Sequence, residues 1–162
     1  HPQLGAVELG GFHYTVLDNP LVSELRETVE GAYRFTVEHA RQHPRIVVED
    51  LRVDQLDGNV YRVRLRVANR GQLPTHVTNK GRTLRRLEPV RASFAPAAGV
   101  ELVSAVGHQE LGHVEGVTGS RVAEWFVAIG AGATDQPQRL GDLQVAGGTG
   151  GDTFLNVMLP GA

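Results

Sequence analysis

The feature that most constrains the fold is a change of hydrophobic period at Pro44. Before this proline, apolar residues recur at helical spacing, and after it they alternate with polar residues. The clearest alternation puts one face on Tyr61, Val63, Leu65 and Val67 and the other on Arg62, Arg64 and Arg66. Asp57-Gly58, just before this stretch, favours a tight turn. We therefore expect a β-hairpin here.

Further short segments with strand character follow at 88–96, 121–130, 139–148 and 153–159, and residues 100–116 read as a second hairpin. Residues 76–87 fit a loop with one helical turn. About seven or eight strands separated by frequent turn signals are typical of an antiparallel sandwich. The expected fold class is mainly β, an immunoglobulin-like antiparallel β-sandwich over residues 45–162.

The residues before Pro44 predict a connector and one helix. Residues 1–18 read as an extended connector with room for one short strand. Asn19 can cap a helix and Pro20 fits its first position. The apolar stripe of this helix would be Leu21, Leu25, Val29, Ala32, Thr36 and Ala40. The helix must end near His43, because a proline disfavours helical backbone in the residue before it. We therefore expect residues 1–44 to form a connector plus helix that is separate from the β domain.

Composition excludes several classes of function. Sixteen basic and 18 acidic residues give a net charge of −2, so nucleic acid is not an expected partner. The absence of cysteine excludes disulfides, thiolate metal sites and cysteine catalysis. No apolar run approaches the roughly 20 residues of a membrane span. The first residue is His1, which suggests a processed product or a piece of a longer protein.

The arginine stripe at 62–66 has two interpretations. It can be the solvent face of a sheet, with Glu49 and Asp54 as cross-strand partners, or a patch for an anionic polymer. We favour the solvent face, because a nucleic-acid platform needs neighbouring aromatic residues.

Two histidine patterns offer metal chemistry as an alternative. With a turn at Leu111-Gly112, one side of a hairpin would carry the zinc-ligand types His108, Glu110, His113 and Glu115. We favour exposed cross-strand contacts, because four ligands in a flat row rarely enclose a tetrahedral ion. His39 and His43 have the i, i+4 spacing of a metalloprotease helix, but Ala40 stands where H-E-x-x-H needs Glu.

Catalytic motifs are otherwise absent, so the sequence assigns no catalytic, cofactor-binding or metal residue. There is no G-x-S-x-G elbow, P-loop or dinucleotide fingerprint. Trp125, the only tryptophan, lies in an apolar strand, which favours core packing over a sugar-stacking platform.

Several stretches resemble one family. "HPQLGAVELGGF" at 1–12, "HPRIVVEDLRV" at 43–53, "YRVRLRVANRGQLPTHVT" at 61–78 and "QELGHVEG" at 109–116 are similar to the C-terminal region of bacterial zinc carboxypeptidase-like proteins of the M14 peptidase family. The V-x-N-x-G part is also similar to bacterial adhesion-type immunoglobulin-like modules. In this motif we expect Asn69 and Gly71, which tolerate positive φ, to let the chain turn. We expect Leu73-Pro74-Thr75 to begin a sheet edge or an irregular crossover.

The resemblance implies a non-catalytic accessory domain whose partner is its own catalytic domain, with zinc held in that missing domain. It also implies that residues 1–44 are the tail end of the catalytic domain or pack against it. The family's H-x-x-E pair, third His and catalytic Glu cannot be mapped here, since His113-Val114-Glu115 is one residue too short. Glu8 is the one acid of the first motif and the candidate to reach the parent's active site. A secreted or cell-envelope location is implied.

Two alternatives stay open. One is a module that binds a cell-surface glycan or protein through a sheet face or the loops at 76–87 and 130–137. The other is a small zinc-dependent enzyme built on the four residues at 108–115.

Overall fold

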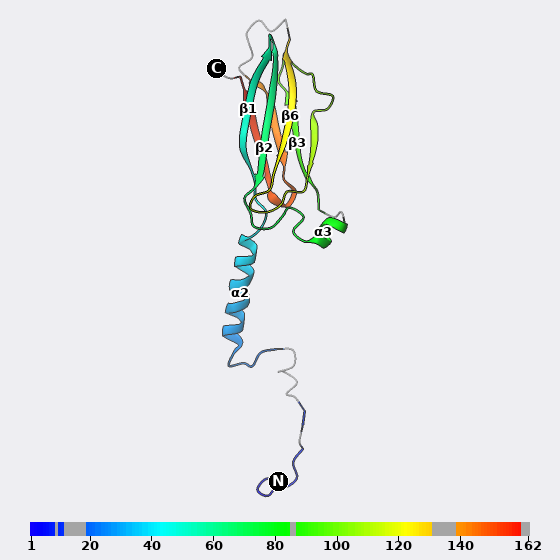
Figure 1. The fold of residues 1–162 in the computed structure, drawn as a ribbon. Helices are drawn as coiled ribbons and strands as arrows, with labels where there is room; N and C mark the ends of the chain where they lie inside the picture. Colours follow the sequence, from blue (N-terminus) through cyan, green and yellow to red (C-terminus); the bar gives the residue numbers. More distant parts are fainter. Residues whose placement is uncertain (9, 12–18, 85–86, 131–138, 160–162) are drawn as a thin grey trace. The chain divides into compact units, whose positions relative to one another are not determined.

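The chain divides into two compact units, residues 1–40 and 41–162 (Figure 1). The computed structural model describes residues 1–8, 10–11, 19–84, 87–130 and 139–159. The division falls a few residues before the predicted boundary at 44/45.

The first unit contains the helix α2 (Leu25–Arg41). The predicted start at Pro20 is wrong, because residues 22–24 form a turn in which the Glu24 amide donates to the Leu21 carbonyl at 2.8 Å. Val22 and Ser23 are weak helix formers, and Val22 is 89% exposed, so no packing offsets their low propensity. The helix ends just before His43, as predicted from Pro44. Residues 1–8 and 10–11 contain no strand, and residues 12–18 of the predicted connector lie outside the described residues.

The second unit is an immunoglobulin-like sandwich of two four-stranded antiparallel sheets (Figure 1), which confirms the predicted fold class. The first sheet has the order β1 (Ile46–Asp57), β2 (Val60–Asn69), β6 (Ser120–Ile129) and β4 (Val100–Leu102). The second has the order β5 (His108–Gly112), β3 (Val90–Pro96), β7 (Arg139–Ala146) and β8 (Asp152–Met158). The short helix α3 (Asn79–Leu84) lies between β2 and β3, and the 3₁₀ turn η1 (Gly148–Gly150) joins β7 to β8.

The β1–β2 hairpin is confirmed, and the second predicted hairpin is wrong. Asp57 pairs with Val60, and Gly58 takes φ of +48° in the turn between them. Within residues 100–116, however, β4 pairs with β6 of the first sheet while β5 pairs with β3 of the second. The segment between them crosses the sandwich at Gly107, whose carbonyl accepts from the Phe94 amide at 2.7 Å. Alternation identified the strands here but not their partners.

The core lies between the sheets and is apolar. Trp125 is fully buried, packs 5.9 Å from the ring of Phe94 in the facing sheet, and donates its indole N–H to the Gly107 carbonyl at 3.0 Å. Around this pair the described residues with no exposed surface include Val63, Leu65, Val67, Val90, Ala92, Val127, Leu140, Val145 and Val157. The expectation of core packing for Trp125 is confirmed.

The V-x-N-x-G motif works through a buried side chain rather than through positive φ. The residues with φ in the left-handed region include neither Asn69 nor Gly71, so that part of the prediction is wrong. Asn69 is fully buried, and its Oδ1 accepts from the amides of Arg45 and Gly71 at 2.9 Å each. Its Nδ2 donates to the carbonyls of Leu73 at 2.8 Å and Val114 at 3.3 Å. One amide side chain thus ties three chain segments together at this end of the sandwich.

Close backbone approach explains the glycines next to this amide. A Cβ on Gly71 would lie 2.0 Å from the His43 carbonyl oxygen, and one on Gly116 would lie 1.9 Å from that of Gln72. Both contacts are with backbone atoms, which cannot rotate away. Of the two predicted possibilities after Leu73-Pro74, a sheet edge or an irregular crossover, the structure has the crossover. Thr75 is buried there and exchanges backbone and hydroxyl hydrogen bonds with Val114.

Candidate functional site

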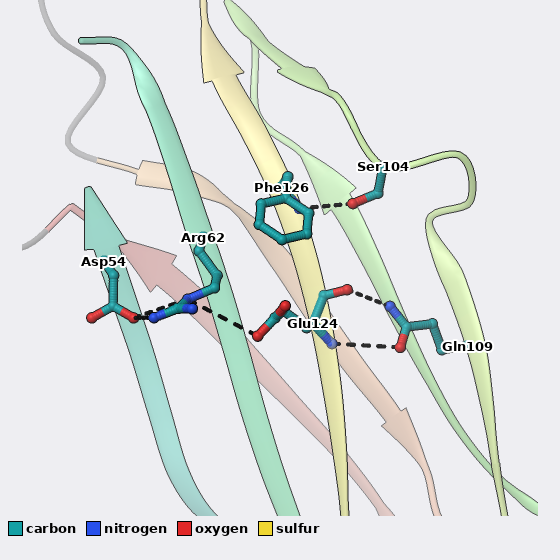
Figure 2. Close-up of polar contacts among 6 residues, drawn as sticks. All are labelled: Asp54, Arg62, Ser104, Gln109, Glu124 and Phe126. Carbon is teal, nitrogen blue, oxygen red and sulfur yellow. Dashed lines mark hydrogen bonds and ion pairs between the residues drawn. The ribbon is translucent and has the colours of Figure 1, made fainter. Parts of the chain in front are cut away.

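The arginine face of β2 is an ion-paired outer surface of the first sheet. Arg62 is paired with Asp54 at 2.7 Å and lies 4.0 Å from Glu124 on its other side (Figure 2). The hydrogen bond with Asp54 raises the pKa of Arg62 above its ordinary value. Arg66 lies 3.3 Å from Glu49. The predicted cross-strand partners Glu49 and Asp54 are therefore confirmed, and exposed pairs of this kind contribute little to stability.

The edge of β6 next to this face is closed by side chains of the opposite sheet and its connection. Gln109 of β5 donates to the Glu124 carbonyl at 2.5 Å and accepts from the Glu124 amide at 3.4 Å (Figure 2). The Phe126 amide donates to the Ser104 hydroxyl at 2.7 Å. These bonds replace the ladder that β4 stops making at Leu102, so this length of edge is not open to an added strand.

The four residues of the predicted zinc alternative do not share a hairpin. Residues 108–112 form the single strand β5, which puts His108 opposite Ser93 and Glu110 opposite Arg91. Gly112 has φ of +75°, and the chain leaves the sheet there. Among the described residues, no group of three or more His, Asp or Glu side chains is placed to hold a metal ion. The predicted hairpin is wrong because β3, and not residues 113–116, supplies the partner of β5.

The structure instead brings His113 and Glu115 to a buried histidine that the sequence had not singled out. His76 is 7% exposed, and its Nε2 lies 3.5 Å from Oε1 of Glu115 without a hydrogen bond to any described residue. The His113 ring meets the His76 ring edge-on, with centroids 5.5 Å apart. Nδ1 of His113 lies 3.3 Å from the Thr75 hydroxyl. Two imidazoles and one carboxylate thus form a small polar cluster at this end of the sandwich.

Charge and burial act together on His113. Burial lowers the pKa of His113 below its ordinary value of 6.5, and the nearby His76 and Arg82 lower it further. Glu110 and Glu115 act in the opposite direction without reversing the shift. The folded protein therefore disfavours the charged imidazolium at this position.

Backbone strain lies beside the same cluster. Val77 has φ of +57° and Val117 has φ of +66°, a region that is costly for β-branched residues. The amides of these two residues donate to the carbonyls of Pro74 at 2.7 Å and Gly71 at 2.8 Å. These bonds, with the buried Asn69, hold the strained conformation in place.

The remaining predicted residues do not assemble into a site. His39 lies exposed on α2, where its ring stacks on Phe35 with centroids 5.8 Å apart. His43 lies beyond the last residue of the helix, so the predicted i, i+4 pair does not share a helical face. Glu8 is exposed in the first unit. The predicted loop at 76–87 contains α3, whereas residues 131–137 of the other predicted loop lie outside the described residues.

A groove of about 440 Å³ lies on the outer face of the second sheet. Strand pairing puts His108, Ser93, Gln144 and Phe154 in one row across this face. The next row contains Ala95, Asp142 and Asn156. Residues paired in this way project from the same side of a sheet, so the two rows line one surface.

Sequence reasoning missed this groove. The predicted strand at 153–159 carries no assignment of its two faces, although Thr153, Leu155 and Val157 alternate with Phe154 and Asn156. That alternation was the available signal that an aromatic residue faces outward. Strand order and register decide which residues of β3, β5 and β7 lie beside Phe154. A local sequence pattern predicts neither of them.

The fold and its surfaces define an immunoglobulin-like β-sandwich domain. A family model described as a domain of unknown function, DUF8731, matches residues 45–139. The match covers more than half of the chain, and the chain belongs to this family. No helix within the described ranges is long and apolar enough to cross a membrane.

Solved structures give weak likenesses. The chain is similar to β-glucosidase 3B from Thermotoga neapolitana, in complexes with α-D-glucose and with glycerol, at 12% identity and a TM-score of 0.30. These alignments cover 72% of this chain and 16% of that enzyme, and at this TM-score they carry no argument. A search of curated proteins gives no match.

Proposed function

We propose that this chain is a non-catalytic accessory domain that docks through its N-terminal helix onto a zinc carboxypeptidase-like catalytic domain of the same protein. The observation that carries the proposal is the apolar stripe of α2. No residue of α2 is buried, and Leu25 and Val29 are 46% and 58% exposed. The described residues of this unit thus supply no core for the helix, and an amphipathic helix gains most of its stability from packing its apolar face.

The resemblance of residues 1–12 to the segment that follows the catalytic region in those peptidases supports the choice of partner. The role of the sandwich would be to support the catalytic domain or to hold it near a substrate or the cell surface. Zinc chemistry would belong to that catalytic domain and not to this chain.

The proposal is tested by hydrogen–deuterium exchange in the full-length protein. The amides of residues 25–41 should exchange at least about tenfold more slowly there than in the 162-residue chain, because docking buries the stripe. Val29→Glu should abolish this protection, since it puts a charge into the docked face. Val22→Glu, in the turn before the helix, is the matched control and should leave the protection intact.

Equal exchange in both contexts would contradict docking. The choice of a peptidase is tested separately by translating the reading frame upstream of His1. An H-x-x-E pair followed by a later His is expected, and its absence would refute the carboxypeptidase assignment.

A further inference from the structure

The groove on the outer face of the β5-β3-β7-β8 sheet results from a difference in side-chain size between its strands. The outward residues of the central strand β3 at the floor are the small Ser93 and Ala95. The edge strands carry larger side chains, His108 on β5 and Phe154 on β8. Small residues between large ones make a trough, and its volume of about 440 Å³ falls in the roughly 300–1,000 Å³ range of small-molecule sites.

The groove combines an uncovered aromatic ring with free amides. Phe154 is 71% exposed. A single exposed aromatic residue is common on protein surfaces and identifies nothing by itself. Here, however, Gln144 lies directly beside the ring, and Asn156 is the next outward residue of the same strand. Neither amide side chain forms a hydrogen bond with any residue that the structure describes, so both are free to bind a ligand.

The charge of the groove selects against anionic ligands. Of the described residues that line it, none is Lys or Arg, and the carboxylate is Asp142. Asp142 is ion-paired with Arg139, which lies outside the lining. An acidic polymer or a phosphate would therefore find no Lys or Arg among these lining residues to pair with, and Arg139 is already engaged by Asp142.

The position of the groove selects against an extended peptide. A peptide that adds to a sheet uses the free backbone groups of an edge strand. The floor of this groove is formed by β3 and β7, which are hydrogen-bonded to neighbouring strands on both sides. The groove therefore offers side-chain amides, a hydroxyl and an imidazole, and its ligand must supply its own dense set of donors and acceptors.

We propose that this groove binds a short neutral oligosaccharide. The apolar face of one sugar ring stacks on Phe154, and the amides of Gln144 and Asn156 bind its hydroxyls, with His108 and Ser93 on the other side of the trough. This inference goes beyond the accessory role and does not rest on it, because the groove and α2 belong to different units. The alternative platform, Trp125, is excluded by its complete burial.

The test is titration of the ¹⁵N-labelled 162-residue chain with neutral tetrasaccharides, namely cellotetraose, maltotetraose, chitotetraose and mannotetraose. At least one should bind with a Kd below about 1 mM, shifting the amide signals of Ser93, Gln144 and Asn156. Tetragalacturonate, an anionic tetrasaccharide, should not bind. Phe154→Ala should weaken binding at least about tenfold, and Phe154→Tyr should retain it.

Phe35→Ala is the matched control, since Phe35 on α2 is also 71% exposed and lies outside the groove. It should bind the sugar like the unchanged protein. The urea midpoint of Phe154→Ala, followed by Trp125 fluorescence, should also be unchanged, which separates lost binding from lost folding. The proposal is overturned if no neutral sugar binds at about 10 mM, if the anionic sugar binds instead, or if Phe154→Ala binds normally. Val29→Glu should leave sugar binding intact, so failure of either proposal is seen separately.

Discussion

Replacing Asn69 with alanine should remove a large polar contribution to the stability of the sandwich. The substitution deletes two hydrogen bonds of 2.9 Å, one of 2.8 Å and one of 3.3 Å, all to backbone groups at this end of the fold. At about 1 kcal/mol net for each bond, the expected loss is about 3–4 kcal/mol. That is a large share of the roughly 5–15 kcal/mol that stabilises a typical domain.

The assay is urea unfolding followed by the fluorescence of Trp125, which is the only tryptophan and is fully buried. With a slope of about 2 kcal/mol per molar urea, the midpoint should fall by about 1.5–2 M. Asn156→Ala is the matched control. It removes an exposed amide that makes no hydrogen bond within the described residues, so it should change the free energy of unfolding by less than about 0.5 kcal/mol.

Asn69→Asp tests the direction of the bonds. A carboxylate cannot donate to the carbonyls of Leu73 and Val114, so this isosteric change should be at least as destabilising as alanine at neutral pH. The reasoning is refuted if Asn69→Ala lowers stability by less than about 1 kcal/mol, or if Asn69→Asp is neutral.

Two further predictions concern the same end of the sandwich and the helix. Gly71→Ala should destabilise the domain by about 3 kcal/mol, because the added Cβ would lie 2.0 Å from a backbone oxygen. A Cβ on Gly31 would meet nothing within 4 Å. Gly31→Ala should therefore favour α2 by about 1 kcal/mol and raise its helical circular dichroism signal. The pKa of His113 is lower in the folded chain than its ordinary value of 6.5. As the pH falls through 6.5, the unfolded chain therefore binds more protons at His113 than the folded chain does. Stability should therefore decline as the pH falls through this value toward the folded pKa. His113→Gln should decline less between about pH 7.5 and 5.5 in urea midpoints, and an identical decline would contradict the assignment.

The sequence established the class of fold because alternation is a local property. In β2, inward Val63, Leu65 and Val67 alternate with three outward arginines, and any sheet built from this strand must bury the first set. The same reasoning located β3, β6, β7 and β8, the β1–β2 turn at Gly58 and the burial of Trp125. The ionic partners of the arginines also followed, because the acidic residues lie on the neighbouring strand of the same hairpin. Their exact register did not, since it shifts between Gln55 and Asp57 and again between Val48 and Asp50.

What only the tertiary structure decided is which segments meet. The partners of β4 and β5, the buried amide of Asn69 and the pairing of His76 with His113 all join residues far apart in the chain. Each depends on strand order and register, which are set by how two sheets close over a shared core and not by any local pattern. For the same reason, the row from His108 to Phe154 became a groove only when four strands from separate parts of the chain lay side by side.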